Sequence, residues 1–169
     1  MRIRFFLLIS AIGLFLDQIT KLSIQKNLIP YQTKPIIGDI VRVTLVYNPR
    51  GIFGMPFGSA YAHFILQLIG IAIVIFFAIR TKAFFYLFSY ALILGGAAGN
   101  LWDRIRLGKV IDFIDIGIKN LRWYTFNLAD FFIVVGIIML IAAEVFRPKP
   151  EAAPKSEEET SKLEIKEQP

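Results

Sequence analysis

Four long apolar blocks dominate this sequence, at about residues 3–22, 60–79, 84–102 and 126–146. A helix needs about 20 largely apolar residues to cross a bilayer, and each block reaches that length. The chain is 56% hydrophobic, whereas soluble domains are usually about 45–50% apolar. We therefore predict a mainly α-helical integral membrane protein built on a bundle of four transmembrane helices.

The connections between these blocks differ in length and composition. The first, at about 30–58, is rich in proline and glycine and contains a β-branched, partly alternating run at 41–47, which predicts a small sheet-like element there. The second connection, 80–83, is so short that the second and third helices must form an antiparallel hairpin. The third connection, at about 103–125, is long enough to re-enter the edge of the membrane.

The end of the chain has a different composition from the rest. Pro, Glu, Lys and Ser dominate residues 148–169, and such a segment buries too little apolar surface to fold. We expect a single membrane domain at 1–147 followed by a disordered tail. Four spans place both ends of the chain on one side of the membrane. Lys and Arg are equally divided between the two sides, so charge bias does not identify the cytoplasmic one.

Composition excludes several kinds of chemistry. The chain has no cysteine, so disulfides, thiolate metal sites and a cysteine nucleophile are excluded. Its one histidine, His63, leaves little for a histidine-based triad or a zinc site. The net charge of +6 does not indicate nucleic-acid binding, because the basic residues lie mostly at the ends of apolar blocks, where they anchor helices at headgroups. We expect no metal and no cofactor.

Two aspartates lie where a membrane protein carries charge only for a reason. Asp130 begins the fourth apolar block, and Asp112 lies in the third connection. An ionisable side chain at membrane depth is costly and marks a functional site by default. In a confined apolar site one carboxyl of a pair keeps its proton while the other ionises. Such a pair activates water and polarises a carbonyl, which suits amide hydrolysis without a covalent intermediate.

Other polar residues accompany these aspartates. Three pairs lie three or four positions apart near block ends, a spacing that places both members on one helix face. With four spans, all three pairs and both long connections meet at the same membrane surface. Unrelated structural residues would scatter over both surfaces, so the clustering indicates a site. The pairs are Asp17 and Lys21, Asn100 and Asp103, and Asn127 and Asp130.

Structural roles remain open for individual residues of this region. The alternatives are an interfacial ion pair for Asp17 and Lys21, another for Asp103 and Arg104, an N-terminal helix cap for Asn127, a close packing surface for Gly95, Gly96 and Gly99, a loop carboxylate for Asp115 and a snorkelling side chain for Glu144.

Short motifs in this order and on four spans resemble those of the bacterial lipoprotein signal peptidases, the type II signal peptidases. The resemblance covers about residues 3–146. The motifs are Asp17-Gln18-Ile19-Thr20-Lys21, Tyr47-Asn48 with Phe53-Gly54, Gly95-Gly96-Ala97-Ala98-Gly99-Asn100-Leu101-Trp102-Asp103-Arg104, Val110-Ile111-Asp112-Phe113-Ile114 and Phe126-Asn127-Leu128-Ala129-Asp130.

The resemblance implies an aspartic membrane endopeptidase. Its substrate would be a prolipoprotein whose lipobox cysteine carries a diacylglyceryl group, and it would cut on the N-terminal side of that cysteine. The catalytic dyad would be Asp112 and Asp130. The supporting polar residues would be Asp17, Lys21, Asn48, Asn100, Asp103, Arg104 and Asn127.

The resemblance also implies a place in the cell. The protein would span the bacterial inner or plasma membrane several times, with both termini in the cytoplasm and the site near the extracytoplasmic face. It implies an extracytoplasmic β-cradle at about 30–58, between the first two spans, and a mobile segment in the third connection, so that the dyad is completed when substrate binds. Besides substrate and membrane lipid we expect no partner, and we expect a monomer.

One motif departs from the family pattern. The family usually has a glycine and a small residue where this chain has Arg50 and Ile52, while Asn48 and Phe53 keep their places. The backbone path at Arg50, and substrate contacts there, are therefore open.

Three other functions make different predictions. A small proton- or ion-coupled transporter would use Asp17, Asp103 and Asp130 as a relay, but it predicts polar residues throughout the membrane depth and often repeats, which we do not find. A metal-dependent enzyme with aspartate ligands would lose activity to a chelator. A structural membrane subunit would tolerate Asp112→Asn and Asp130→Asn.

Overall fold

The computed structural model describes residues 2–49 and 60–146. Four helices in this part of the chain are long and apolar enough to cross a membrane, which confirms the predicted spans. They are α1 (Arg2–Asn27), α2 (Ala60–Arg80), α3 (Phe84–Leu107) and α4 (Leu128–Val145). The predicted tail at 148–169 and the predicted cradle residues 50–58, Arg50, Ile52 and Phe53 among them, lie outside the described residues.

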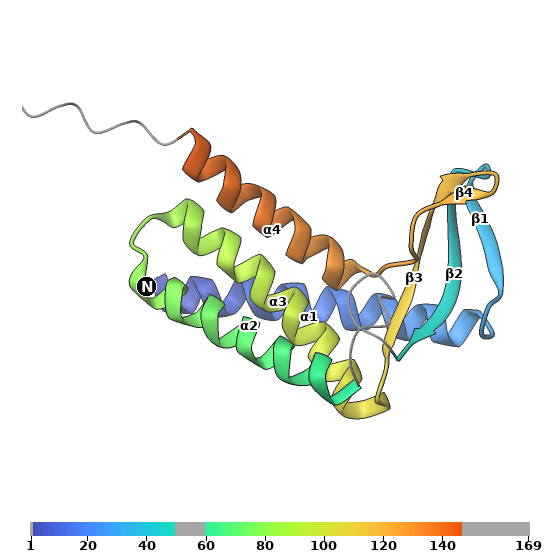
Figure 1. The fold of residues 1–169 in the computed structure, drawn as a ribbon, viewed down its shortest axis with the longest axis horizontal. Coiled ribbons are helices and arrows are strands. Elements are labelled where there is room, and N and C mark those ends of the chain that lie inside the picture. Colours follow the sequence, from blue (N-terminus) through green and yellow to red (C-terminus); the bar gives the residue numbers. More distant parts are fainter. Residues whose placement is uncertain (1, 50–59, 147–169) are drawn as a thin grey trace, which may run out of the picture.

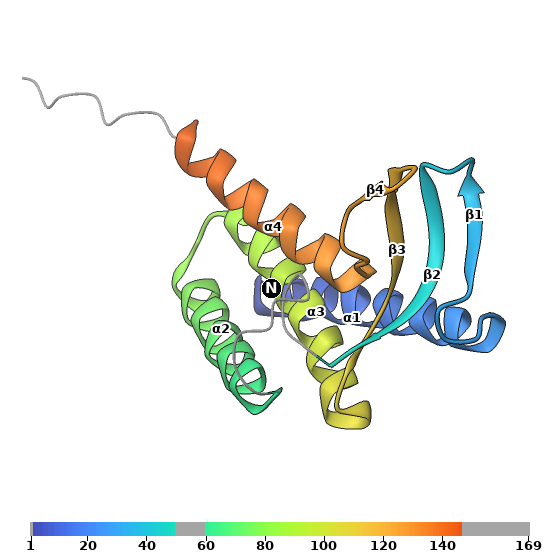
Figure 2. The ribbon, with the colours of Figure 1, turned by 45° about the vertical axis from the view of Figure 1, so that its right-hand side comes forward.

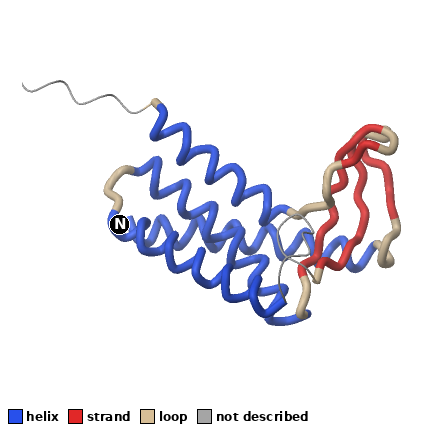
Figure 3. The backbone as a smooth tube through the Cα atoms, in the orientation of Figure 1, coloured by secondary structure: helices blue, strands red, loops and turns tan. Residues whose placement is uncertain are grey.

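The helices lie side by side as a bundle, with a small sheet at one end (Figures 1 and 3). The N-terminus and the loop between α2 and α3 lie at the opposite end (Figure 1). Helix α3 packs against all three other helices and is the most buried of the four. Only residues 81–83 separate α2 from α3, which confirms the predicted hairpin (Figure 2).

Small residues allow α3 to approach its neighbours closely. A Cβ on Gly95 would lie 2.7 Å from the backbone oxygen of Ser10 on α1, and one on Gly96 would strike the backbone oxygen of Ala129 on α4. The Ser10 hydroxyl donates to the Ala91 carbonyl at 3.1 Å, across the same contact. The predicted packing role of these glycines is confirmed, as expected for helices that associate in lipid through close van der Waals contact.

The C-terminal end of α3 follows from local sequence. Gly108 terminates α3 in the left-handed conformation with φ 68°, and its N–H bonds to the Arg104 carbonyl. A residue with a side chain is strained there, which is why glycine stops the helix. Helix α3 therefore continues five residues past the predicted end at 102, and the chain turns directly into the third connection.

The sheet contains four antiparallel strands in the order β1-β2-β3-β4. Strands β1 (Thr33–Ile37) and β2 (Val41–Asn48) come from the first connection, as predicted from the β-branched run. Strands β3 (Val110–Ile118) and β4 (Leu121–Arg122) come from the third connection. The predicted small sheet between the first two spans is therefore confirmed. The third connection adds two strands to this same sheet.

An apolar cluster attaches the sheet to the bundle. Leu28, just after α1, packs with Leu45 of β2 and Ile111 of β3, and all three are buried. Leu107 at the end of α3 packs against this cluster. The sheet is thus held at the end of α1 and α3. This contact determines the position of Asp112, the residue after Ile111.

Candidate active site

Asp130 lies in the first turn of α4, where it forms a capping box with Asn127. The Asn127 carboxamide oxygen accepts from the Asp130 backbone N–H at 2.9 Å, and the Asp130 carboxylate accepts from the Asn127 N–H at 3.4 Å. These contacts use backbone N–H groups that the start of a helix leaves unpaired. The N-cap interpretation of Asn127 is therefore confirmed, and the cap also fixes the position of Asp130.

Asp112 lies on strand β3 opposite Val46 of β2. Its neighbour along the ladder, Val110, pairs with Asn48, so the Asn48 and Asp112 side chains are diagonal neighbours. The Asn48 carboxamide donates to Asp112 Oδ2 at 3.0 Å. The strand register therefore positions Asp112 beside Asn48.

Asn127 joins the two predicted dyad residues. Its Nδ2 donates to Asp112 Oδ1 at 2.7 Å, while its backbone N–H contacts the Asp130 carboxylate. Asn127 is fully buried, and Asp112 is only 3% exposed. A strand of the third connection and the start of the fourth span thus meet at one buried amide.

The environment of Asp112 favours its protonated form. Burial is the largest effect, and the nearby Asp130 carboxylate adds to it, so together they raise the pKa of Asp112 to about 7 against hydrogen bonds from Asn48 and Asn127. Asp112 therefore holds a proton well above the pH at which an exposed aspartate loses it. One protonated and one ionised carboxyl is the state that general acid and base catalysis requires.

A buried ionic cluster supports this site from behind. Lys21 Nζ lies 2.8 Å from Asp17 Oδ2 and 2.8 Å from Asp103 Oδ2, and all three side chains are fully buried. Asp17 Oδ1 also accepts from the Ala129 N–H, at 2.9 Å, in the first turn of α4. Asp17 and Lys21 do form the predicted ion pair, but it is buried inside the bundle, where its contacts hold α1, α3 and α4 together.

Asn100 links the ionic cluster to the aspartates. Its Oδ1 accepts from Lys21 Nζ at 2.9 Å and from Asn127 Nδ2 at 3.0 Å. Its Nδ2 donates to Asp130 Oδ1 at 2.7 Å. The hydrogen bonds therefore run without a break from the cluster to both carboxylates.

Arg104 contacts the second helix and not the carboxylate next to it in sequence. Its guanidinium donates to Gln67 Oε1 on α2 at 2.7 Å, while Asp103 pairs with Lys21. The interfacial Asp103–Arg104 ion pair is thus not what forms. Arg104 still lies within electrostatic reach of Asp112 and Asp130, so all seven supporting residues lie close to the proposed dyad or to the cluster behind it.

Two glutamines of the site were not predicted from the sequence. Gln18 Nε2 lies within 3.1 Å of Asp17 Oδ2 and of Asp103 Oδ1. Gln67 accepts from Arg104 and donates to the Ala97 carbonyl at 2.7 Å. A polar residue inside an otherwise apolar span, as Gln67 is, was the available signal.

Asp115 has a different role from the one predicted. It lies in β3 and is buried, so it is not a loop carboxylate. Arg122 Nε lies 2.6 Å from its Oδ1, and Arg42 contacts its Oδ2 at 3.0 Å. Burial alone would raise the pKa of Asp115, but the hydrogen bonds and charges of the two arginines together lower it below its ordinary value. This carboxylate ties β2, β3 and β4 together.

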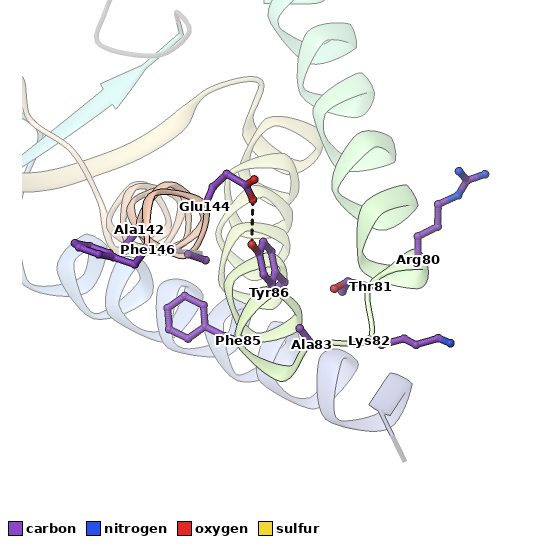
Figure 4. Close-up of a pocket in the computed structure, with 10 residues that line it drawn as sticks. Arg80, Thr81, Lys82, Ala83, Phe85, Tyr86, Ala142, Glu144 and Phe146 are labelled. Atoms are coloured by element: carbon purple, nitrogen blue, oxygen red, sulfur yellow. Dashed lines mark hydrogen bonds between the residues drawn. The ribbon is translucent and has the colours of Figure 1, made fainter. Parts of the chain in front are cut away.

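The opposite end of the bundle holds an open groove of about 820 Å³ between the α2–α3 loop and the end of α4 (Figure 4). The Tyr86 hydroxyl donates to Glu144 there, at 3.1 Å. Glu144 thus bonds to a neighbouring helix as well as lying near the surface. Neither predicted catalytic aspartate lines this groove.

The described residues contain no group of three or more His, Cys, Asp or Glu side chains arranged to hold a metal ion. What they bring together is a pair of buried carboxyls held by three carboxamides beside a lysine and an arginine. This arrangement is suited to activating water next to a polarised carbonyl.

A comparison with protein families agrees with this chemistry. The family model described as signal peptidase (SPase) II matches residues 9–146. The chain belongs to the signal peptidase II family. Membership makes it a peptidase, and the four apolar helices make it a multi-pass membrane protein.

Individual relatives of this signal peptidase II family member support the assignment. A lipoprotein signal peptidase of Moorella thermoacetica is 40% identical over 143 residues, which cover 80% of this chain and 89% of the relative. One of Pseudomonas fluorescens is 39% identical over 149 residues, covering 83% of this chain and 86% of that one. A solved bacterial membrane enzyme shares the fold with a TM-score of 0.79 and 27% identity, covering 89% of this chain and 95% of its own.

Proposed function

We propose that this protein removes the signal peptide from prolipoproteins whose lipobox cysteine carries a diacylglyceryl group, cutting on the N-terminal side of that cysteine. Membership of the signal peptidase II family supports this substrate class. A lipid chain gains roughly 0.8 kcal/mol for each methylene it buries. Such a substrate stays in the bilayer, so its peptidase must present catalytic groups at membrane depth.

Asp112 and Asp130 form the catalytic dyad in this proposal. The observation that carries it is the hydrogen-bond network in which Asn127 and Asn100 contact both carboxylates. The ionised carboxyl takes a proton from water as the water attacks the scissile carbonyl carbon. The protonated carboxyl donates to the carbonyl oxygen, and a proton then passes to the leaving nitrogen as the C–N bond breaks.

The remaining polar residues hold this dyad. Asn48, Asn100 and Asn127 donate hydrogen bonds to its oxygens, and the buried cluster of Asp17, Lys21 and Asp103 supports Asn100. Arg104 lies close enough to stabilise negative charge that develops on the carbonyl oxygen. In this proposal residues 1–147 act as a single membrane peptidase domain.

The proposal includes an orientation in the membrane. Both termini lie in the cytoplasm, and the sheet and the dyad lie at the extracytoplasmic face. Signal peptides are removed from exported proteins, so the scissile bond reaches the enzyme from that face.

The test is cleavage of a purified, diacylglyceryl-modified prolipoprotein by the purified protein in detergent with EDTA present. Asp112→Asn and Asp130→Asn should each lower the rate by about 100-fold or more, the size of effect expected for loss of a general acid or base. Asp39→Asn is the matched control, because Asp39 lies exposed in the turn between β1 and β2. Circular dichroism checks that each variant folds.

Several outcomes contradict the proposal. Cleavage at the wild-type rate by either dyad variant would remove that aspartate from catalysis. Loss of all activity on adding EDTA would favour a metal-dependent enzyme. Absence of cleavage by the wild-type protein would reject the substrate assignment.

A further inference from the structure

Two carboxamides, Asn100 and Asn127, separate the buried Lys21 from the aspartates. A carboxamide has a donor end and an acceptor end, so its two possible orientations present opposite groups to each neighbour. Both amides are buried, which prevents water from replacing a mismatched partner. The orientation of each amide is therefore decided by whichever neighbour has only one hydrogen-bonding capacity.

Lys21 decides the orientation of Asn100. An ammonium group has three donors and no acceptor, and Lys21 Nζ lies 2.9 Å from the Asn100 carboxamide. The oxygen of Asn100 must face it. The opposite end, Nδ2, must then face Asp130 Oδ1, and does so at 2.7 Å.

The start of α4 decides the orientation of Asn127 in the same way. The backbone N–H of Asp130 only donates, and it lies 2.9 Å from Asn127 Oδ1. Nδ2 of Asn127 therefore faces Asp112 Oδ1, at 2.7 Å, and the Asn100 oxygen, at 3.0 Å. The second of these bonds forms only while Lys21 holds the Asn100 oxygen on this side.

The ammonium of Lys21 is itself held in place. Asp17 and Asp103 contact it at 2.8 Å each, and its side chain is fully buried. Two carboxylates at this distance hold the ammonium by charge-assisted contacts. They also leave the group no room to turn away from Asn100.

We propose that Lys21 is a positioning residue that fixes the Asn100 amide with its N–H group towards Asp130, beside the Asn127 amide that the start of α4 holds, so that the proton shared by Asp112 and Asp130 resides on an Oδ2. This inference rests on the proposed function. Each Oδ1 accepts an amide N–H at 2.7 Å, and a proton on that oxygen would weaken this short hydrogen bond. The Oδ2 atoms accept longer hydrogen bonds. Asp112 Oδ2 accepts from Asn48 Nδ2 at 3.0 Å, and Asp130 Oδ2 accepts from the Asn127 N–H at 3.4 Å.

The consequence is a pH profile that depends on amide orientation. If Lys21 is replaced by a side chain that also accepts, Asn100 can turn over and present its oxygen to Asp130. Two oxygens then face each other, and the dyad ionises only at higher pH. Among residues 2–49 and 60–146, the charged groups around the dyad are Asp17 and Lys21 on α1 and Asp103 and Arg104 on α3, while β2 contributes the neutral Asn48.

The experiment measures kcat for prolipoprotein cleavage as a function of pH in Lys21→Gln. We expect the acid limb of the profile to move up by about one pH unit or more, since a hydrogen bond to a charged group is lost, and kcat at neutral pH to fall about 10-fold or more. Lys26→Gln is the matched control, because it removes a positive charge from the exposed surface near the same end of α1.

A charge-balanced pair of variants separates orientation from simple electrostatics. Lys21→Gln combined with Asp103→Asn removes one positive and one negative charge, which also protects the fold if Lys21→Gln alone does not fold. Asp103→Asn alone retains the donor-only ammonium against Asn100. We expect the acid limb to move further up in the double variant than in Asp103→Asn.

Infrared spectra give a readout that does not need turnover. The carboxyl C=O band that disappears in Asp112→Asn or Asp130→Asn reports the shared proton, and we expect it to persist to higher pH in the double variant than in Asp103→Asn. An unchanged profile and band in a folded Lys21→Gln or double variant would overturn the inference. Wild-type activity in Asp112→Asn or Asp130→Asn would instead overturn the proposed function.

Discussion

Asp112 is buried and accepts hydrogen bonds, and yet its pKa is raised. It lies at 3% exposure, accepts two carboxamide hydrogen bonds and still has a pKa raised to about 7, because burial and Asp130 outweigh its donors. The folded protein therefore carries a carboxyl that costs stability whenever it is ionised. A raised carboxyl pKa of this kind is expected at a site whose chemistry needs a proton at neutral pH.

This cost predicts a pH-dependent effect of Asp112→Asn on stability. Between about pH 3.8, the ordinary value, and about pH 7 the folded state binds more protons than the unfolded state, so wild-type stability falls as pH rises through this window. Over this whole pH window, the free energy of unfolding of the wild type falls by about 4 kcal/mol. The variant lacks the titrating group, so its unfolding midpoint in detergent, relative to wild type, should be higher at pH 8 than at pH 5.

Asp39→Asn is the control for this measurement, because Asp39 lies exposed in the β1–β2 turn. Its midpoint relative to wild type should change little between the two pH values. A difference between Asp112→Asn and wild type that is the same at pH 5 and pH 8 would show that Asp112 is not protonated in the folded protein.

At the level of elements, the site depends on how closely α3 approaches α1 and α4. Gly95 and Gly96 bring the backbones together, and Gly99 lies against the Asp17 carboxylate. The distances around Lys21 and Asn100 follow from this contact, because their side chains come from different helices. A change in helix spacing should therefore affect both stability and activity.

Gly96→Ala tests this dependence. The added methyl group would strike the Ala129 backbone oxygen and lie 3.0 Å from Ile133 Cγ1, so α4 must move away from α3. We expect a loss of about 1–3 kcal/mol in stability and a fall in cleavage rate, measured by thermal unfolding and by the prolipoprotein assay.

Gly70→Ala is the matched control on α2. A Cβ there meets nothing within 4 Å, and alanine favours a helix over glycine by about 1 kcal/mol. Stability should therefore stay the same or rise. Equal effects of the two substitutions would mean that close α3–α4 packing does not limit the site.

The whole molecule is polarised along the bundle. The sheet lies at one end of the bundle, while the N-terminus and the α2–α3 loop lie at the other (Figure 1). Asp112 lies on strand β3 of this sheet, and Asn127 and Asn100 connect it to Asp130 and to the ionic cluster. The polar residues of the site form one connected network, which fits hydrolysis at one membrane surface better than a relay across the membrane. Orientation then decides which compartment the site serves.

The absence of cysteine makes this orientation directly testable. Lys34 on β1 and Lys82 between α2 and α3 are exposed and lie at opposite ends of the bundle. In intact bacterial cells, a membrane-impermeant thiol reagent should label Lys34→Cys, whereas Lys82→Cys should react only after the membrane is disrupted. The wild-type chain is the unlabelled control, and the reverse pattern would invert the proposed topology.

The four spans follow from the sequence alone, which also singled out two aspartates as candidates. Bilayer thickness imposes a length and an apolar composition on every span, and both are local properties that can be read directly. The cost of charge at membrane depth singles out Asp130 in the same way. The short motifs carried Asp112 and the supporting residues through resemblance to a family.

Only the tertiary structure decided how these residues meet. Asp112 reaches Asn127 because β3 pairs with β2 in one register, with Asp112 opposite Val46, and pairing between distant strands leaves no local signal. For the same reason the sequence did not predict the four-stranded sheet or the buried position of Lys21 between Asp17 and Asp103. It also did not predict the hydrogen bonds of Gln18 and Gln67. Each depends on contacts between segments far apart in the chain, and close helix packing determines which of these contacts form.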